Sequence, residues 1–152
     1  MIGKLPVSKI DLVLKENILG RIGCSYQGKT YIVPTNYVYD GKNIICHSLT
    51  GMKIDMMRKN PSVCFEVEDM KSMTEWKTVI LQGQFQELTD ETDRYKAMKL
   101  LVDKMLRLKI SESAVLPERA EKRMHPRSPG ALKPVIYRII VTEKTGRFEK
   151  SS

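Results

Sequence analysis

A chain of 152 residues with a net charge of +8 is long enough for one domain with its own hydrophobic core, because domains commonly run to ~100–150 residues. Its 41% hydrophobic and 29% charged residues exclude a disordered protein, and no apolar run approaches the ~20 residues of a membrane span. No apolar stretch follows Lys4, so we expect no signal peptide and a single cytoplasmic domain over residues 1–152.

The positive charge raises the question of partners, because a basic protein can bind nucleic acid, an acidic membrane surface or an anionic small molecule. Lys and Arg are spread along the chain, with a loose concentration over residues 104–133. Aromatic residues do not interleave with them as a base-stacking platform requires. The sequence therefore favours a solvated basic surface with a phosphate-bearing ligand over nucleic acid or a membrane.

The three cysteines, Cys24, Cys46 and Cys64, lack the spacing of metal ligands. Each lies among apolar residues, which is typical of a buried thiol that acts as a small hydrophobic side chain. An odd number of cysteines without a secretion signal indicates a reducing compartment. We expect free thiols and no metal site.

The first third of the chain predicts one helix followed by short strands. Ile10, Val13 and Leu14 have helical spacing behind Ser8, which is a suitable N-cap, so we expect a helix over residues 8–15. Turn signals then divide a β-rich region. The strands, separated by turns at Gln27-Gly28 and Asp40-Gly41, are expected over residues 18–26, 30–39 and 43–47.

Further along, helices and strands alternate. A short helix is predicted over residues 51–59 and ends at Asn60-Pro61, because a residue before proline avoids helical geometry. A longer helix begins at Asp90, and its apolar positions recur at helical spacing as far as Leu106. The remaining strands are expected over residues 63–67, 78–88 and 135–142. Short strands joined by hairpins, with a few helices, predict an antiparallel barrel with helices at its ends.

Residues 111–134 carry four prolines with charges between them and show no secondary-structure pattern. A structureless segment of this length is unusual unless it forms a lid, so we allow for one helical turn after Pro117. His125 lies in this segment. It is expected as a surface residue or, if the segment folds over a cofactor, as a proton donor.

Pro34 conflicts with the strand that surrounds it. A proline cannot donate to a strand ladder, so it belongs at an edge, a bulge or a break. A break would leave backbone groups of Val33, Thr35 and Asn36 free to bind a planar heterocycle. The alternative is an edge strand that simply tolerates a proline.

A second conflict lies in the segment His47-Ser48-Leu49-Thr50-Gly51-Met52-Lys53, which joins a strand to a helix. Lys53 falls in the first helical turn, where the helix dipole disfavours a cation by ~0.3–1 kcal/mol. An anion at the helix N-terminus would reverse that effect. Free backbone N–H groups, two hydroxyls and a lysine are suited to holding a phosphate. The alternative is an exposed lysine on an amphipathic helix.

These features occur in a defined order with further motifs around them. The segments concerned are Val33-Pro34-Thr35-Asn36-Tyr37, Asp40-Gly41, His47-Ser48-Leu49-Thr50-Gly51-Met52-Lys53, Asn60-Pro61, Trp76-Lys77-Thr78-Val79, Gly83 and Thr145-Gly146-Arg147. Together they resemble the FMN-binding split-barrel family related to pyridoxamine 5′-phosphate oxidase. Met52 stands before Lys53 where the oxidase has arginine, so the likeness is closer to the nitroimidazole-resistance branch.

The resemblance implies a mainly β fold, a six-stranded antiparallel split β-barrel with peripheral helices. It also implies a homodimer with one FMN at each end of the subunit interface. Trp76 would lie near the flavin or pack against the partner subunit. The other implied cofactor-binding residues are Val33, Pro34, Thr35 and Asn36 at the isoalloxazine ring and His47, Ser48, Thr50, Met52 and Lys53 at the ribityl phosphate.

The implied activity is that of an FMN-dependent oxidoreductase that passes electrons from a reduced nicotinamide to a small acceptor, such as a nitroaromatic. The flavin performs the redox chemistry, and the protein orients it and shapes the acceptor side. The sequence shows no catalytic constellation of its own, so no catalytic residue is assigned. The alternatives are a non-catalytic flavin- or haem-binding electron carrier and, less favoured, a basic barrel that binds nucleic acid.

Overall fold

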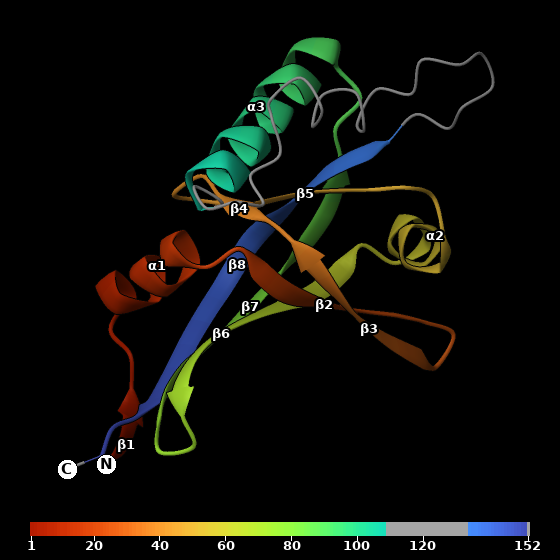
Figure 1. Ribbon diagram of the computed structural model, residues 1–152. Helices are drawn as coiled ribbons and strands as arrows, with labels where there is room; N and C mark the ends of the chain where they lie inside the picture. Colours follow the sequence, from red (N-terminus) through yellow and green to blue (C-terminus); the bar gives the residue numbers. More distant parts are fainter. Residues whose placement is uncertain (109–133, 152) are drawn as a thin grey trace.

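One antiparallel sheet and three helices make up the part of the chain that the computed structural model describes, residues 1–108 and 134–151 (Figure 1). The strands follow one another across the sheet in the order β3-β2-β6-β7-β8-β5-β4, and β1 pairs with β8. The elements are β1 (Ile2–Lys4), α1 (Val7–Glu16), β2 (Leu19–Tyr26), β3 (Lys29–Asn36), β4 (Val38–Tyr39), β5 (Ile44–Ser48), α2 (Met52–Lys59), β6 (Ser62–Ser72), β7 (Glu75–Glu87), α3 (Glu91–Leu108) and β8 (Val135–Glu149).

The sheet coils without closing, because its two outer strands, β3 and β4, do not pair with each other. Six strands of five or more residues form the body of the sheet, and the short β1 and β4 extend it. The expected split-barrel fold, mainly β with peripheral helices, is confirmed. The expected six strands correspond to these six longer ones.

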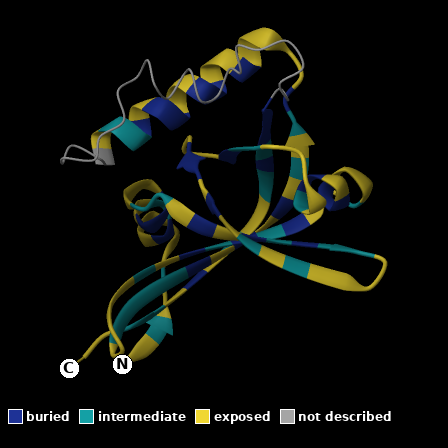
Figure 2. Cartoon of the chain, turned by 45° about the vertical axis from the view of Figure 1, so that its right-hand side comes forward, coloured by how far each residue is buried: buried dark blue, intermediate teal, exposed yellow. Residues whose placement is uncertain are grey.

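Two groups of buried side chains hold the helices to the sheet (Figure 2). The larger group fills the barrel and joins it to α1 and α2, with Phe65, Leu14 and Met57 fully buried. The smaller one packs α3 against β4, β5 and β8 through residues such as Leu101 and Ile136. Within the described residues, no helix is long and apolar enough to cross a membrane.

The long pairing of β7 with β8 contains a bulge at Gly83. The register shifts between Gln82 and Gly83. A Cβ atom at Gly83 would lie 2.5 Å from the carbonyl oxygen of Ile140, so a side chain there would force the backbone to shift. Glycine at this position therefore allows the two backbones to approach where the sheet bends.

Several strands were predicted too short. The strands expected over residues 63–67 and 78–88 are longer and form one hairpin, in which β6 runs to Ser72 and β7 starts at Glu75. The last strand continues to Glu149, past the expected end at residue 142. Charged residues lie on both faces of these added segments, so the alternation of apolar and polar residues that marks a strand is missing there.

The strand expected over residues 30–39 divides at Tyr37, whose N–H donates to the carbonyl of Ile18 at 3.0 Å. The segment at residues 111–134, with the helical turn expected after Pro117 and with His125, lies outside the described residues except for Pro134.

Pro34 does not interrupt its strand. β3 is continuous from Lys29 to Asn36 and pairs only with β2 among the described strands, so the edge-strand alternative is confirmed and the expected break was wrong. The hydrogen bond from Tyr37 to Ile18 makes these two residues a hydrogen-bonded pair of the antiparallel ladder. Because hydrogen-bonded and non-hydrogen-bonded pairs alternate, the next pair, Leu19–Asn36, is non-hydrogen-bonded. The pair Arg21–Pro34 comes two positions after Leu19–Asn36, so it is also non-hydrogen-bonded and the nitrogen of Pro34 faces away from β2.

Candidate functional site

The turn after β5 leads into a helix N-terminus that has no side-chain cap. Gly51 is the N-cap of α2, and the first helical bond runs from the Asp55 N–H to the Gly51 carbonyl at 3.0 Å. A Cβ at Gly51 would meet no atom within 4 Å, so the space beside it is open. The first N–H groups of a helix lack intrahelical partners and favour an anion. The turn therefore has the geometry of an anion cradle.

Lys53 adds a positive charge to this cradle. Its ammonium is half-buried and forms no ion pair or hydrogen bond with any described residue. Burial lowers the pKa of Lys53, while the Cys46 and Cys24 thiols have a smaller effect in the opposite direction. A half-buried cation without a carboxylate is costly unless an anion accompanies it. Lys53 is thus suited to bind a phosphate.

His47 lies at the end of β5 and pairs with Ile136 of β8. Burial, and then the positive charge of Lys53, lower the pKa of His47 from its ordinary 6.5. The imidazole is therefore neutral at pH 7 and offers one N–H donor and one acceptor. The neighbouring Ser48 is half-buried, and its hydroxyl donates to the Leu49 carbonyl at 2.8 Å.

Behind His47, three polar side chains gather inside the barrel. Cys46 pairs with Tyr137 of β8, and the Thr35 hydroxyl of β3 lies near both. The Tyr137 hydroxyl oxygen is fully buried, yet it has no hydrogen-bond partner among the described residues. Burial raises the pKa of Cys46 to about 12, so its thiol stays protonated. Sequence reasoning missed Tyr137, because an aromatic residue in an apolar strand gives no functional signal.

The predicted ring-binding residues lie on β3, beside the inner cluster. Val33 and Thr35 point inward, and the Thr35 hydroxyl donates to the Asn36 carbonyl at 3.2 Å. Pro34 and Asn36 are exposed on the opposite side, opposite Arg21 and Leu19 of β2. In this register the backbone polar groups of Val33 and Thr35 face β2, whereas those of Pro34 and Asn36 face away from it. Only part of the predicted set is thus free to bind a ligand through its backbone.

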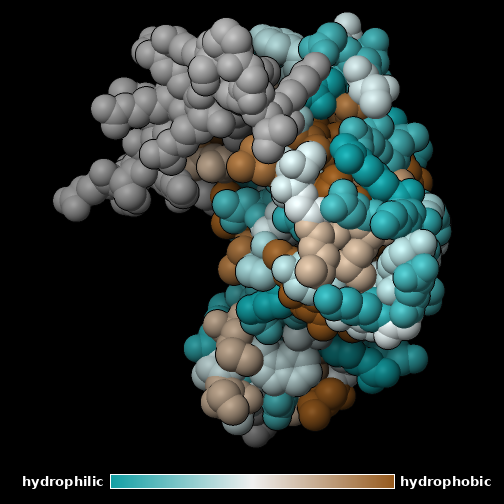
Figure 3. All heavy atoms as spheres, turned by 90° about the vertical axis from the view of Figure 1, so that its right-hand side faces the viewer, coloured by the Kyte–Doolittle hydropathy of each residue, from teal (hydrophilic) through white to brown (hydrophobic). Residues whose placement is uncertain are grey.

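The face that carries α2 mixes apolar and polar side chains. Figure 3 views the molecule from the right-hand side of Figure 1, where α2 lies, and shows apolar patches broken by polar side chains. Within the turn, Leu49 is 62% exposed and Met52 is 48% exposed. Ile32 of β3, at another place in the sequence, is 65% exposed. Thr50 and Gly51 are also exposed. Met52 and Thr50 are therefore accessible to a ligand, and their predicted contacts with a cofactor stay predictions.

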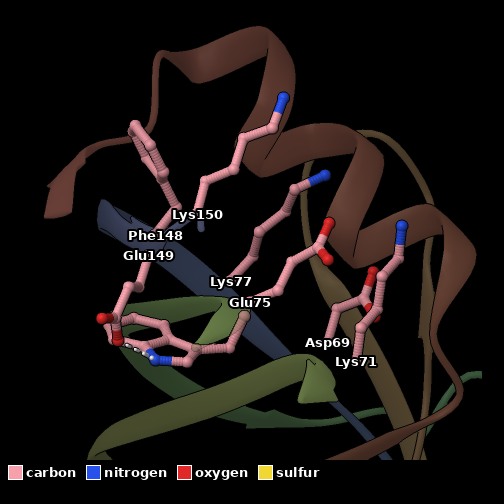
Figure 4. Close-up of a pocket in the computed structure, with 8 residues that line it drawn as sticks. Asp69, Lys71, Glu75, Lys77, Phe148, Glu149 and Lys150 are labelled. Carbon is pink, nitrogen blue, oxygen red and sulfur yellow. Dashed lines mark hydrogen bonds between the residues drawn. The ribbon is translucent and has the colours of Figure 1, made fainter. Parts of the chain in front are cut away.

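Trp76 lies elsewhere, at the β6–β7 hairpin. Its indole N–H donates to a carboxylate oxygen of Glu149 at 2.8 Å, drawn as the dashed line in Figure 4. A cavity of about 210 Å³ lies here, and none of its lining residues belongs to the cradle. Figure 4 shows the ammonium groups of Lys77 and Lys150 pointing to the same side as the Glu75 carboxylate. Within one chain, the structure does not bring Trp76 to the cradle.

Metal-binding side chains do not cluster in the described part of the chain. No group of three His, Cys, Asp or Glu side chains there could hold a metal ion. Cys24, Cys46 and Cys64 are free thiols, the first two buried and the third half-buried. The chemistry of the site thus depends on the anion cradle and the hydroxyl and thiol groups behind it.

Known proteins resemble this chain in sequence and in fold. An uncharacterised protein of Rhizobium meliloti, RA0666, is 33% identical over 125 residues, which are 80% of this chain and 70% of that protein. A Mesorhizobium loti protein described as FAD-binding has a TM-score of 0.75 at 23% identity, with 99% of each chain covered. A candidate 5-nitroimidazole antibiotic resistance protein of Bacteroides thetaiotaomicron has a TM-score of 0.71 at 14% identity, covering 97% of this chain and 87% of that one.

The two structural likenesses show a shared fold, and the sequence identifies the family. Residues 6–148 match the family described as pyridoxamine 5′-phosphate oxidase. This match spans the barrel from α1 to the end of β8 and includes the cradle, the β3 edge and the Trp76 hairpin. The chain therefore belongs to the pyridoxamine 5′-phosphate oxidase family.

Proposed function

We propose that this protein binds FMN at the opening of the barrel and passes electrons from a reduced nicotinamide to a small acceptor. The observation that carries the proposal is Lys53, a half-buried cation without a partner among the described residues, beside the uncapped N-terminus of α2. An ammonium and free helix N–H groups are the donors that a phosphate monoester prefers. The FAD-binding description of the Mesorhizobium loti structure supports a flavin as the molecule that carries the phosphate.

The remaining site residues have defined roles in this proposal. Neutral His47 donates a hydrogen bond to the ribityl chain or phosphate, and the Ser48 hydroxyl reorients to do the same. The outward backbone groups of Pro34 and Asn36 face the polar edge of the ring. Exposed Met52 covers apolar ring surface. The bound flavin supplies the redox chemistry, and these residues hold and orient it.

Flavin binding in this proposal involves a homodimer. Leu49 and Met52 leave apolar surface at the cradle that a monomer would expose to water. Trp76 of one subunit then packs against the partner or reaches its flavin, because Trp76 lies away from the cradle of its own chain. Sedimentation of the FMN-loaded protein tests this arrangement. A dimer is expected, and a monomer that retains FMN contradicts it.

An absorbance spectrum of the purified protein, followed by mass analysis of what acid releases, tests the cofactor. A flavin spectrum with FMN released is the expected result. Release of FAD would keep the phosphate cradle and change the flavin. A Soret band would favour the haem-binding alternative, and a colourless protein that refuses added FMN would contradict the cradle.

The reaction itself is tested by steady-state oxidation of NADH and of NADPH with a panel of nitroaromatics. The likeness to a candidate 5-nitroimidazole resistance protein of Bacteroides thetaiotaomicron makes nitroaromatics the first acceptors to try. Turnover with one nicotinamide and one acceptor class is expected. Bound FMN that neither nicotinamide reduces would favour the electron carrier over the enzyme.

A further inference from the structure

A second cavity lies between α1, the β4–β5 hairpin and α3, at a distance from the cradle. Its volume is about 610 Å³, within the ~300–1,000 Å³ range of small-molecule sites. Figures 1 and 2 both place α1 and α2 on opposite sides of the barrel, so this cavity and the α2 cradle do not coincide. Apolar groups of Val38, Tyr39 and Leu100 form part of its wall.

Lys104 of α3 lies in the wall of this cavity and is only 5% exposed. Its ammonium donates to the carbonyls of Leu14 (3.4 Å) and Asn17 at the end of α1, and it lies 4.3 Å from the centre of the Tyr37 ring. No carboxylate among the described residues pairs with it. Burial, with a smaller effect of Arg107, lowers the pKa of Lys104 to about 8.

The charges at the rim add to that of Lys104. Lys15 and Arg107 also line the cavity, and neither forms an ion pair within the described residues. Of the two carboxylates in the wall, Asp40 already accepts the N–H groups of Lys42 and Asn43 at 2.9 and 2.7 Å, while Glu16 is exposed. The cavity therefore combines apolar surface with cations that lack anionic partners.

Buried charges in proteins are normally paired, and the carbonyls of α1 use two of the three N–H groups of Lys104. We propose that this cavity binds a small amphiphilic carboxylate, whose carboxylate pairs with Lys104 and whose apolar body lies against Leu100, Val38 and Tyr39. One remaining N–H on a buried ammonium suits a singly charged carboxylate better than a phosphate dianion. The site is independent of the proposed flavin site.

Octanoate is a suitable probe, with 1-octanol as its neutral match of similar length. We would titrate the protein, with FMN in excess, and follow the methyl resonances of Ile, Leu and Val by NMR. The expected result is shifts concentrated at Val38 and Leu100, with octanoate binding at least tenfold more tightly than 1-octanol. Shifts elsewhere, equal affinity for the two probes, or no binding would overturn the proposal.

Lys104→Met removes the charge and keeps the length of the chain. It is expected to reduce octanoate affinity at least tenfold and to leave 1-octanol binding unchanged. Lys99→Met is the matched control, because Lys99 is exposed on the same helix and does not line the cavity. An unchanged preference for octanoate in Lys104→Met would refute the pairing. If that variant does not fold, a substitution at exposed Arg107, Arg107→Met, is expected to reduce octanoate affinity about threefold. The map of methyl shifts on the parent protein then shows independently whether octanoate binds in this cavity.

Discussion

Tyr137 of β8 lies directly opposite Cys46 of β5 in the antiparallel ladder, and its buried hydroxyl has no hydrogen-bond partner among the described residues. Buried polar groups are nearly always satisfied, and one that is not calls for an explanation such as a bound water, an ion or a catalytic role. The pair lies one strand position from His47. The positive charge of Lys53 acts on both Cys46 and His47, so the pair lies within the electrostatic reach of the anion cradle.

The Tyr137 hydroxyl gives a stability prediction for the flavin-free protein. An unsatisfied buried polar group costs about 1–3 kcal/mol, so Tyr137→Phe is expected to raise the free energy of unfolding by about 1 kcal/mol in urea. Tyr37→Phe is the matched control, because the Tyr37 hydroxyl donates to the Leu14 carbonyl at 2.8 Å, and it should lose about 1 kcal/mol. Equal losses in both variants would show that Tyr137 is satisfied.

Lys53 gives a prediction for flavin affinity. Removal of a hydrogen bond to a charged group costs about 1.5–3 kcal/mol, so Lys53→Met should weaken FMN binding about 10- to 150-fold by fluorescence titration. Lys59→Met, at the exposed end of the same helix, should bind as tightly as the parent. If Lys53→Met retains the affinity of the parent, the phosphate does not lie at this helix.

His47 gives a prediction for how the stability of the protein depends on pH. Burial, and then the charge of Lys53, hold its pKa in the folded protein below 6.5, so the unfolded chain binds the proton more readily. By linkage, His47 causes the free energy of unfolding to fall as pH decreases from 6.5 through the lowered pKa of the folded state. His47→Gln should remove this part of the acid sensitivity in urea melts between pH 7 and pH 5. Identical pH profiles for the parent and the variant would contradict the assignment.

Gly83 gives a prediction for the fold. A Cβ there would lie 2.5 Å from the Ile140 carbonyl oxygen, so Gly83→Ala forces two paired strands apart. Overpacking of this kind costs about 1–3 kcal/mol, and the urea midpoint should fall accordingly. Gly51→Ala is the control, because nothing lies within 4 Å of its Cβ and it should change stability by less than about 0.5 kcal/mol. A tolerated Gly83→Ala would mean that the bulge can relax.

Local signals in the sequence were sufficient to predict the overall fold. Asp40-Gly41 and Gln27-Gly28 mark hairpin turns, and both glycines have positive φ angles in the structure. Helical spacing located α1 and α3 correctly to within a few residues. β1 was missed, because a three-residue strand has no periodicity and forms only by pairing with distant β8. Such pairing depends on contacts that no short window of sequence contains.

Parts of the candidate site could be predicted for a similar reason. The turn from His47 to Lys53 is continuous in sequence, so its helix N-terminus and its lysine were visible as a local conflict. Tyr137 and Thr35 become neighbours of Cys46 only when three strands from distant parts of the chain meet. Lys104 gave no signal either, because its burial depends on the packing of α3 over the end of α1. Sites assembled by tertiary packing are therefore not apparent in the pattern.

The proline in β3 has a further consequence for how the protein behaves at high concentration. An outer strand with free N–H groups can template the addition of a strand from another molecule, which is a route to aggregation. The nitrogen of Pro34 faces outward and carries no hydrogen, so it interrupts that template in the middle of the strand. The barrel can thus keep one side open for a ligand while resisting the growth of a continuous sheet between molecules.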